Sequence, residues 1–161
     1  MQDASHLWWA IRPSLKYKTL ELRAPDCCTR IDDTIALAAL YRSLARFLFA
    51  NPEHNAGLNV VDRAIAVENK WRAQRYGARG TFVTRSGGIA VGELLNMVLD
   101  LVAADAEALD CSDQVEDCRT IVSDGTSADA QLQIFAENEH EGTEIALKKV
   151  SRWIRDATLA A

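Results

Sequence analysis

A carboxylate and a guanidinium lie two positions apart in a short strand-like segment near the start of the chain. The segment spans residues 19–23, and alternation along a strand puts Glu21 and Arg23 on one face, opposite two leucines. A carboxylate can hold a divalent cation, and a guanidinium can hold a phosphate oxygen. The pair therefore indicates magnesium–nucleotide chemistry, although an ordinary ion pair on a strand explains the same spacing.

A second group of polar side chains crowds the end of a helix predicted over residues 60–76. Asn69 and Arg72 share one face, and Arg75 follows close to the glycine that ends the helix. Such a cluster is suited to receive phosphate or carboxylate groups. Because Glu68 is spaced to pair with Arg72, a salt-bridged helix face explains the cluster equally well.

The elements that must position these residues follow from the hydrophobic pattern. Residues 7–12 and 19–23 are predicted to pair as a hairpin. Residues 81–83 and 89–91 flank a glycine-containing turn, which indicates either a second small hairpin or an exposed loop. Helices are predicted from Asp32 to the Asn51–Pro52 stop, over 60–76 after a cap at Asn59, over 92–109 and over 113–123. A short helix is predicted after a cap at Ser127, and a last one over 141–159. The fold class is therefore α+β and predominantly helical, with about five to six helices packed on a small antiparallel strand region. We expect a single domain over residues 1–161, with strands at about 7–23 and helices at about 32–160.

Composition narrows the classes of function. The 161 residues are 48% hydrophobic and 25% charged, as in ordinary globular proteins, and no apolar run reaches the roughly 20 residues of a membrane span. The first 85 residues carry a net charge of +5 and the remainder −10. The basic half suits an anionic ligand, and the acidic total argues against general nucleic-acid binding.

The four cysteines indicate reduced thiols. Cys27 and Cys28 are adjacent, Cys111 and Cys118 lie far along the chain, and the spacing of a zinc site is absent. There is no signal-peptide pattern at the start of the sequence. We therefore expect a cytoplasmic protein with free cysteines.

Several stretches together resemble one family, the type 2 glutamate–cysteine ligases, also called carboxylate-amine ligases. They are residues 8–14 (WWAIRPS), 19–23 (TLELR), 68–77 (ENKWRAQRYG) and 125–129 (GTSAD). The similarity extends over nearly the whole chain in the right order, so it is far more specific than any single motif. It places the chain in the C-terminal portion of the family pattern.

The resemblance implies a function and a site. Members of this family join an amine such as cysteine to the side-chain carboxylate of glutamate through a γ-glutamyl phosphate, using ATP and Mg²⁺, which implies a part in glutathione biosynthesis. Their catalytic sheet is related to that of glutamine synthetase. Carried over, Glu21 would hold Mg²⁺, Arg23 would steady the acyl phosphate, and Arg12 would be a second anion contact. The residues placed near the cofactor are Asn69, Arg72 and Arg75.

Two departures from the family pattern matter. Many relatives have an acidic residue where this chain has Ala10. The resemblance also implies a family chain about twice as long, whose N-terminal half carries other metal-binding carboxylates. We therefore expect that this chain alone does not turn over and needs that half as a partner.

The unpaired strand edges also predict a homo-oligomer. A non-catalytic helical module for interaction or oligomerisation is the alternative from another class. A general anion-binding domain that binds ATP without metal is a third possibility.

Overall fold

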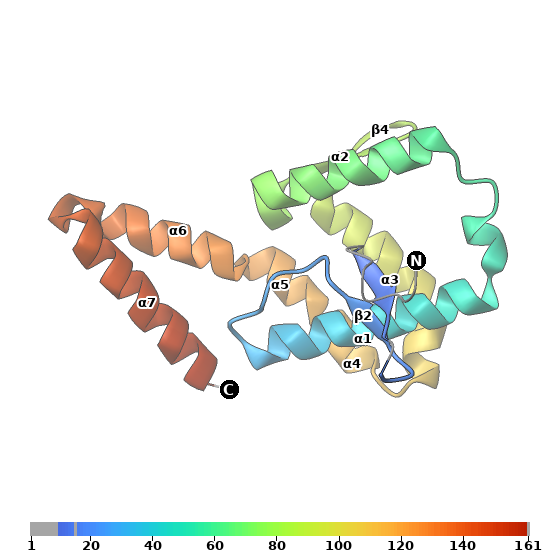
Figure 1. The fold of residues 1–161 in the computed structure, drawn as a ribbon, viewed down its shortest axis with the longest axis horizontal. Coiled ribbons are helices and arrows are strands. Elements are labelled where there is room, and N and C mark those ends of the chain that lie inside the picture. Colours follow the sequence, from blue (N-terminus) through green and yellow to red (C-terminus); the bar gives the residue numbers. More distant parts are fainter. Residues whose placement is uncertain (1–9, 15, 161) are drawn as a thin grey trace.

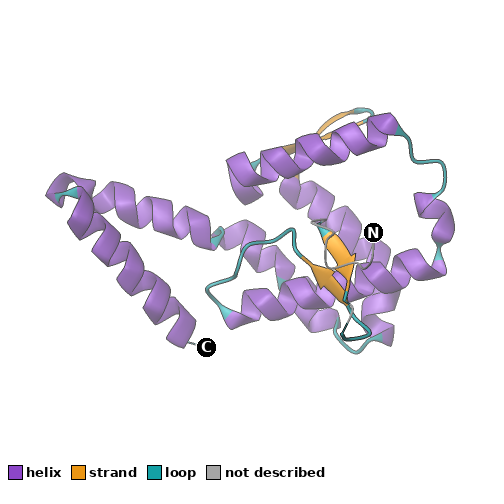
Figure 2. Ribbon diagram, in the orientation of Figure 1, coloured by secondary structure: helices purple, strands orange, loops and turns teal. Residues whose placement is uncertain are grey.

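The computed structural model describes residues 10–14 and 16–160, and Figure 1 shows how its elements are arranged. The strands are β1 (Ile11–Pro13), β2 (Leu20–Leu22), β3 (Thr81–Thr84) and β4 (Gly87–Ala90). The α-helices are α1 (Ile31–Ala50), α2 (Val60–Tyr76), α3 (Val91–Ala108), α4 (Ser112–Glu116), α5 (Cys118–Asp124), α6 (Ser127–Asn138) and α7 (Thr143–Leu159). Helices make up most of the described residues (Figure 2), so the predicted α+β, predominantly helical class is confirmed.

The helices divide into a body and an arm. Helix α1 lies against α3, α4 and α5, whereas α6 and α7 pack on each other and extend to one side as an antiparallel pair (Figure 1). The core of the body lies where α1 meets α3 and α4. It consists of Ala39, Phe47, Leu99, Val102, Ala106, Cys111 and Val115. Burying a side chain such as Leu99 stabilises the fold by about 1.5–3 kcal/mol. The core therefore holds α1, the helix beneath the first hairpin, against α3 and α4.

The first predicted hairpin is present as a short ribbon. Strands β1 and β2 are antiparallel, with Arg12 directly opposite Glu21. Backbone hydrogen bonds extend the pairing beyond the strands, from Arg23 N–H to the Ala10 carbonyl (2.7 Å) and from Ser14 N–H to the Thr19 carbonyl (2.9 Å). The predicted strand at 7–12 is described only from residue 10 onwards, and residues 7–9 lie outside the described part of the chain.

The bounds of α2 agree with its predicted cap. The Asn59 side chain accepts a hydrogen bond from the Val61 N–H (2.9 Å), and Asp62 accepts one from the Asn59 N–H (2.9 Å). Reciprocal capping of this kind satisfies N–H groups that the helix itself leaves unpaired. The helix ends at Gly77, whose φ of 59° lies in the left-handed region that favours glycine.

Two predicted helices differ from the structure. The single helix expected over 113–123 is two helices, because Thr120 N–H bonds to the carbonyl of Asp117 only three residues back, which tightens the chain between α4 and α5. The cap of α6 is Thr126 and not Ser127, which is already the first helical residue. Thr126 is the N-cap because its side chain and that of Asp129 form a capping box.

All four cysteines, which lie within the described residues, are free thiols, as predicted. No helix among the residues described has the length and apolar character that crossing a membrane requires.

Candidate functional site

The charged residues of the first hairpin form a linked triad. Arg12 donates from Nε to Glu21 Oε2 (2.5 Å), and Arg23 Nε lies 3.7 Å from Glu21 Oε1. The register explains the geometry, because Arg12 faces Glu21 across the ribbon and Arg23 follows Glu21 on the same face. Each carboxylate oxygen of Glu21 therefore faces a guanidinium, and the triad carries a net charge of +1.

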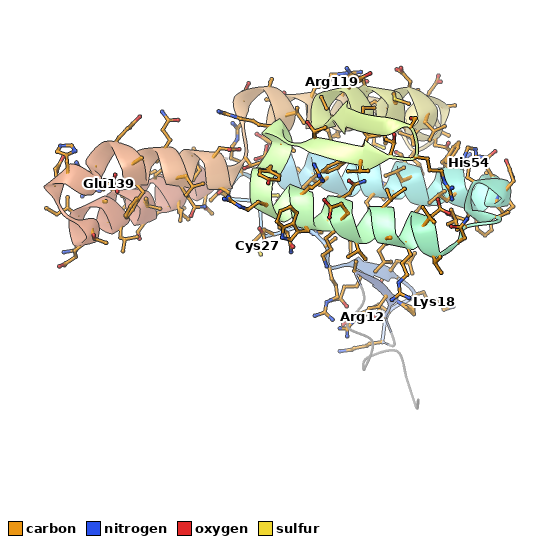
Figure 3. The ribbon with its side chains drawn as sticks, turned by 90° about the horizontal axis from the view of Figure 1, so that it is seen from above. Arg12, Lys18, Cys27, His54, Arg119 and Glu139 are labelled. Atoms are coloured by element: carbon orange, nitrogen blue, oxygen red, sulfur yellow. The ribbon has the colours of Figure 1, made fainter. Side chains whose placement is uncertain are left out.

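The triad lies on the side of the ribbon away from the helices. The apolar residues of the two strands, Ile11, Leu20 and Leu22, line a groove against α1. Because strand residues alternate between faces, the three charged side chains belong to the opposite face. Figure 3 shows Arg12 on the ribbon, at a distance from the helical body. A positively charged, partly exposed strand face of this kind is suited to bind an anion such as a phosphate or a carboxylate.

The triad does not fit Mg²⁺ by itself. Within residues 10–14 and 16–160 there is no group of three or more histidine, cysteine, aspartate or glutamate side chains able to hold a metal ion. Glu21 is the single carboxylate of the triad, and both of its oxygens already face guanidinium groups. Mg²⁺ takes a near-octahedral set of oxygen ligands, so its remaining donors would have to come from elsewhere.

Asn69 and Arg72 hold α2 against the second hairpin. Asn69 donates from Nδ2 to the Val83 carbonyl (2.9 Å) and accepts from the Val83 N–H at Oδ1 (2.7 Å), so it pairs with β3 as a neighbouring strand would. Arg72 donates from Nε to Glu68 (2.7 Å) and from a terminal nitrogen to the Thr81 carbonyl (3.2 Å). These contacts give both residues a structural role, and their predicted contact with a cofactor stays a prediction.

Arg75 lines a cavity of about 340 Å³. Three segments meet there. They are residues 25–28 between β2 and α1, residues 73–77 at the end of α2, and residues 126–129 at the start of α6. The Arg75 guanidinium lies over the Tyr76 ring, 5.7 Å from its centroid, and has no ion pair among the described residues. It is therefore available to an anion, unlike the guanidinium of Arg72.

Sequence reasoning missed that this cavity exists. The stretches 68–77 and 125–129 stood out in the sequence separately, and nothing in their spacing indicated that they meet. Cys27 and Cys28 also line the cavity, and Figure 3 shows Cys27 beside the end of α2. The one signal in the sequence that could have linked the two stretches is that both belong to the same family pattern.

The pKa values of Asp129, which lines this cavity, and of Cys118, which is buried in the body, are both shifted. Hydrogen bonds from the Thr126 backbone N–H and hydroxyl hold the pKa of Asp129 below its ordinary value, with Arg79 adding to the effect. Burial raises the pKa of the Cys118 thiol to about 11, helped by the negative charges of Asp117 and Asp33. Asp129 is therefore ionised and committed to the cap of α6, while Cys118 is a protonated packing residue.

The family profile and the similar proteins found by comparison all point to one family. The sequence profile of glutamate-cysteine ligase family 2 matches residues 1–149. A protein of Bradyrhizobium diazoefficiens named "Putative glutamate--cysteine ligase 2" is 52% identical over 158 residues, which are 98% of this chain and 36% of that protein. Proteins with the same name from Bradyrhizobium sp. (strain ORS 278) and Rhodospirillum rubrum are 54% and 42% identical, over 99% and 85% of this chain and 38% and 36% of their own lengths. The chain thus spans little more than a third of these relatives, which are nearly three times as long as this chain and not twice as long as expected.

Proposed function

The chain belongs to glutamate-cysteine ligase family 2, and we propose that it supplies the C-terminal part of an ATP-dependent ligase that joins glutamate to an amine. The amine, for which cysteine is the family's example, attacks a γ-glutamyl phosphate. The observation that carries the proposal is the triad on the outer face of the β1–β2 ribbon, where Arg12 and Arg23 are held on either side of Glu21. This is the stretch at which the resemblance to the family puts the anion contacts.

The triad suits the chemistry of the proposed reaction. Phosphoryl transfer to a carboxylate brings two anions together, so its main need is charge neutralisation and alignment. In the proposal, Arg12 and Arg23 bind the phosphate or glutamate oxygens, and Glu21 orients both guanidinium groups before the substrates arrive. Pre-oriented donors need no rearrangement when charge develops, which is the usual source of such stabilisation.

The cofactors belong to the complete enzyme. We propose that ATP and Mg²⁺ bind to the complete enzyme. Because the described donors do not complete a magnesium site, Glu21 would be one metal ligand among several. Mg²⁺ would neutralise phosphate charge when bound. Arg75 is a further proposed anion contact, since it lines the cavity and has no ion pair among the described residues, whereas Asn69 and Arg72 act mainly by holding α2 on β3. A cytoplasmic location and a homo-oligomer stay predictions.

The test uses a chimera in which this chain replaces the matched 158 residues of the Bradyrhizobium diazoefficiens relative. Glu21→Gln is compared with Glu68→Gln, since the two carboxylates are similarly exposed (43% and 45%) and each pairs with an arginine. We expect Glu21→Gln to lower glutamate-dependent ADP release by about 10²-fold or more, and Glu68→Gln to leave it close to that of the unaltered chimera.

Equal activity in the two variants would contradict the proposed role of the triad. A non-catalytic interaction module, the alternative function, predicts no effect of either substitution on nucleotide chemistry. An anion-binding domain would bind ATP in the absence of Mg²⁺ and would keep that binding in the Glu21→Gln variant.

A further inference from the structure

The cavity lined by Arg75 has the size of a site for a small molecule. Its volume of about 340 Å³ lies at the lower end of the range of roughly 300–1,000 Å³ that is typical of ligand pockets. Residues 25–28, 73–77 and 126–129 meet there, and Asp33 and Leu37 of α1 complete the wall. We call this space the Arg75 cavity.

Some polar groups of the Arg75 cavity are already used within the fold. The Thr126 hydroxyl donates to Asp129 (2.7 Å), which also accepts a hydrogen bond from the Thr126 N–H (2.7 Å). The Ser127 hydroxyl accepts one from Gln131 Nε2 (2.9 Å). These groups are committed to the first turn of α6, so they are not the ones that a ligand would find unpaired.

Two charged groups of opposite sign in the Arg75 cavity have no counterpart. Asp33, in the first turn of α1, is half-buried and has neither an ion pair nor a side-chain hydrogen bond among the described residues. The Arg75 guanidinium likewise forms no ion pair in this part of the chain, with Asp33 or with any other carboxylate. A partly buried charge without a partner costs free energy. The cavity therefore offers one place for a cation and another for an anion.

The rest of the lining is mostly apolar. Leu37 of α1, Ile121 of α5 and Leu132 of α6 all line the cavity. Leu132 is 71% exposed, so hydrocarbon placed in the cavity would cover apolar surface that now faces water. Cys27 and Cys28 add two thiols, which pack as small apolar groups.

We infer that the Arg75 cavity binds an α-amino acid as a zwitterion. Its α-carboxylate would pair with the Arg75 guanidinium, its α-ammonium group with Asp33, and its side chain would lie against the apolar lining. A simple anion would leave Asp33 without a partner, and a simple amine would leave Arg75 without one. One small molecule that carries both charges satisfies both groups at once.

The charges of the lining also favour one kind of side chain. Among the described residues of the cavity wall, Arg75 is the single cation, whereas Asp26, Asp33 and Asp129 are carboxylates. A second carboxylate on the ligand would meet charges of its own sign. The preferred ligand therefore has a small apolar or thiol side chain. Glutamate, which the proposed reaction brings to the triad, is disfavoured.

The Arg75 cavity is separate from the triad. It is formed by residues 25–28 beyond the end of β2 and by the helices, whereas the triad lies on the face of the ribbon turned away from the helices. An amino acid in the cavity has two sources. It is either the amine that the ligase joins to glutamate, a reading that rests on the proposed function, or an effector that binds whether or not the enzyme turns over.

The first experiment is calorimetric titration of the chain with matched probes. L-2-Aminobutyrate has nearly the shape of cysteine without the reactive thiol, butyrate lacks its ammonium group, and propylamine lacks its carboxylate. We expect L-2-aminobutyrate to bind, and butyrate, propylamine and L-glutamate to bind at least about tenfold more weakly, because each leaves a charge unpaired or adds a repelled one. This comparison uses the unaltered chain, so it does not depend on the folding of a variant.

Substitutions then locate the site. Arg75→Gln and Asp33→Asn should each weaken binding of L-2-aminobutyrate by about tenfold or more. The matched controls should leave it unchanged. Arg63→Gln alters another exposed arginine of α2 that has no ion pair among the described residues, and Asp32→Asn alters the neighbouring carboxylate, which pairs with Arg30.

The outcomes separate the two sources from an error in the inference. In the chimera, a raised KM for the amine in Asp33→Asn would identify the ligand as the acceptor, and an unchanged KM together with lost binding would identify an effector. Binding of butyrate or propylamine as tight as that of L-2-aminobutyrate, no binding of any probe, or equal losses in the variants and their controls would overturn the inference. A chimera without ligase activity would contradict the proposed function and leave the binding result standing.

Discussion

Removing the side-chain amide of Asn69 should loosen the second hairpin. Asn69 is the one side chain of α2 that pairs with both backbone groups of Val83, at 2.9 Å and 2.7 Å. The substitution Asn69→Ala removes both hydrogen bonds and leaves the half-buried Val83 N–H and carbonyl without partners from α2. We therefore predict that the substitution lowers the stability of the fold, rather than affecting ligand binding alone.

The expected size follows from these two bonds. Each contributes about 0.5–1.5 kcal/mol net, so the pair is worth about 2 kcal/mol. Alanine is the better helix former, which returns about 0.6 kcal/mol. We expect the free energy of unfolding to fall by about 1.5 kcal/mol at 25 °C.

Urea unfolding followed by circular dichroism measures this difference. Lys70→Ala is the matched control, because Lys70 is the next residue on α2, is exposed and has no ion pair among the described residues. The control should change the free energy of unfolding by less than about 0.5 kcal/mol. Equal effects of the two substitutions on the free energy of unfolding would contradict the role of the Asn69–Val83 hydrogen bonds in holding α2 on β3. A change in nucleotide affinity without a change in stability would instead make Asn69 a cofactor contact.

The remaining predictions concern the cavity that contains Arg75 and its surroundings. At pH 8 a maleimide should label the exposed Cys27 of the folded chain and not Cys118, because burial and a pKa of about 11 keep the Cys118 thiol protonated and shielded. Mass spectrometry of the labelled peptides measures this, and equal labelling of the two cysteines would contradict it. Thr126→Ala should cost about 1 kcal/mol in urea unfolding, because it removes the hydroxyl of the α6 cap. Since the pKa of Asp129 is lowered in the folded state, its contribution is present above the ordinary value of 3.8 and is lost as the pH falls through the lowered pKa. The stability difference between the unaltered chain and Asp129→Asn should accordingly disappear in acid, and a difference that grows in acid would contradict the assignment.

The sequence predicted the parts of the fold that depend on local chemistry. Alternation in residues 19–23 predicted which face of the ribbon carries Glu21 and Arg23, and the cap at Asn59 predicted the start of α2. The break between α4 and α5 was not predicted, because the apolar stripe continues through it. The separation of the α6–α7 arm from the body depends on which helices pack together, and hydrophobic periodicity does not specify that.

The candidate site was predicted unevenly for the same reason. Glu21 and its two arginines are neighbours in one hairpin, so strand geometry alone was enough to bring them together. Asn69, Arg72 and Arg75 were grouped by nearness in sequence. Arg75 is six residues from Asn69 and therefore projects from a different side of the helix. It meets a segment some 50 residues further along the chain, which only the tertiary packing reveals.

The most direct test of the central proposal follows one oxygen atom. The chimera is supplied with ATP, an amine and glutamate labelled with ¹⁸O in its side-chain carboxylate. If that carboxylate attacks the γ-phosphorus and the amine then displaces phosphate from the acyl carbon, the released phosphate keeps one oxygen from glutamate. We predict one ¹⁸O in each inorganic phosphate released, and loss of this transfer in the Glu21→Gln variant. Phosphate that is released without label, or label transfer that is unchanged in the variant, would contradict the account.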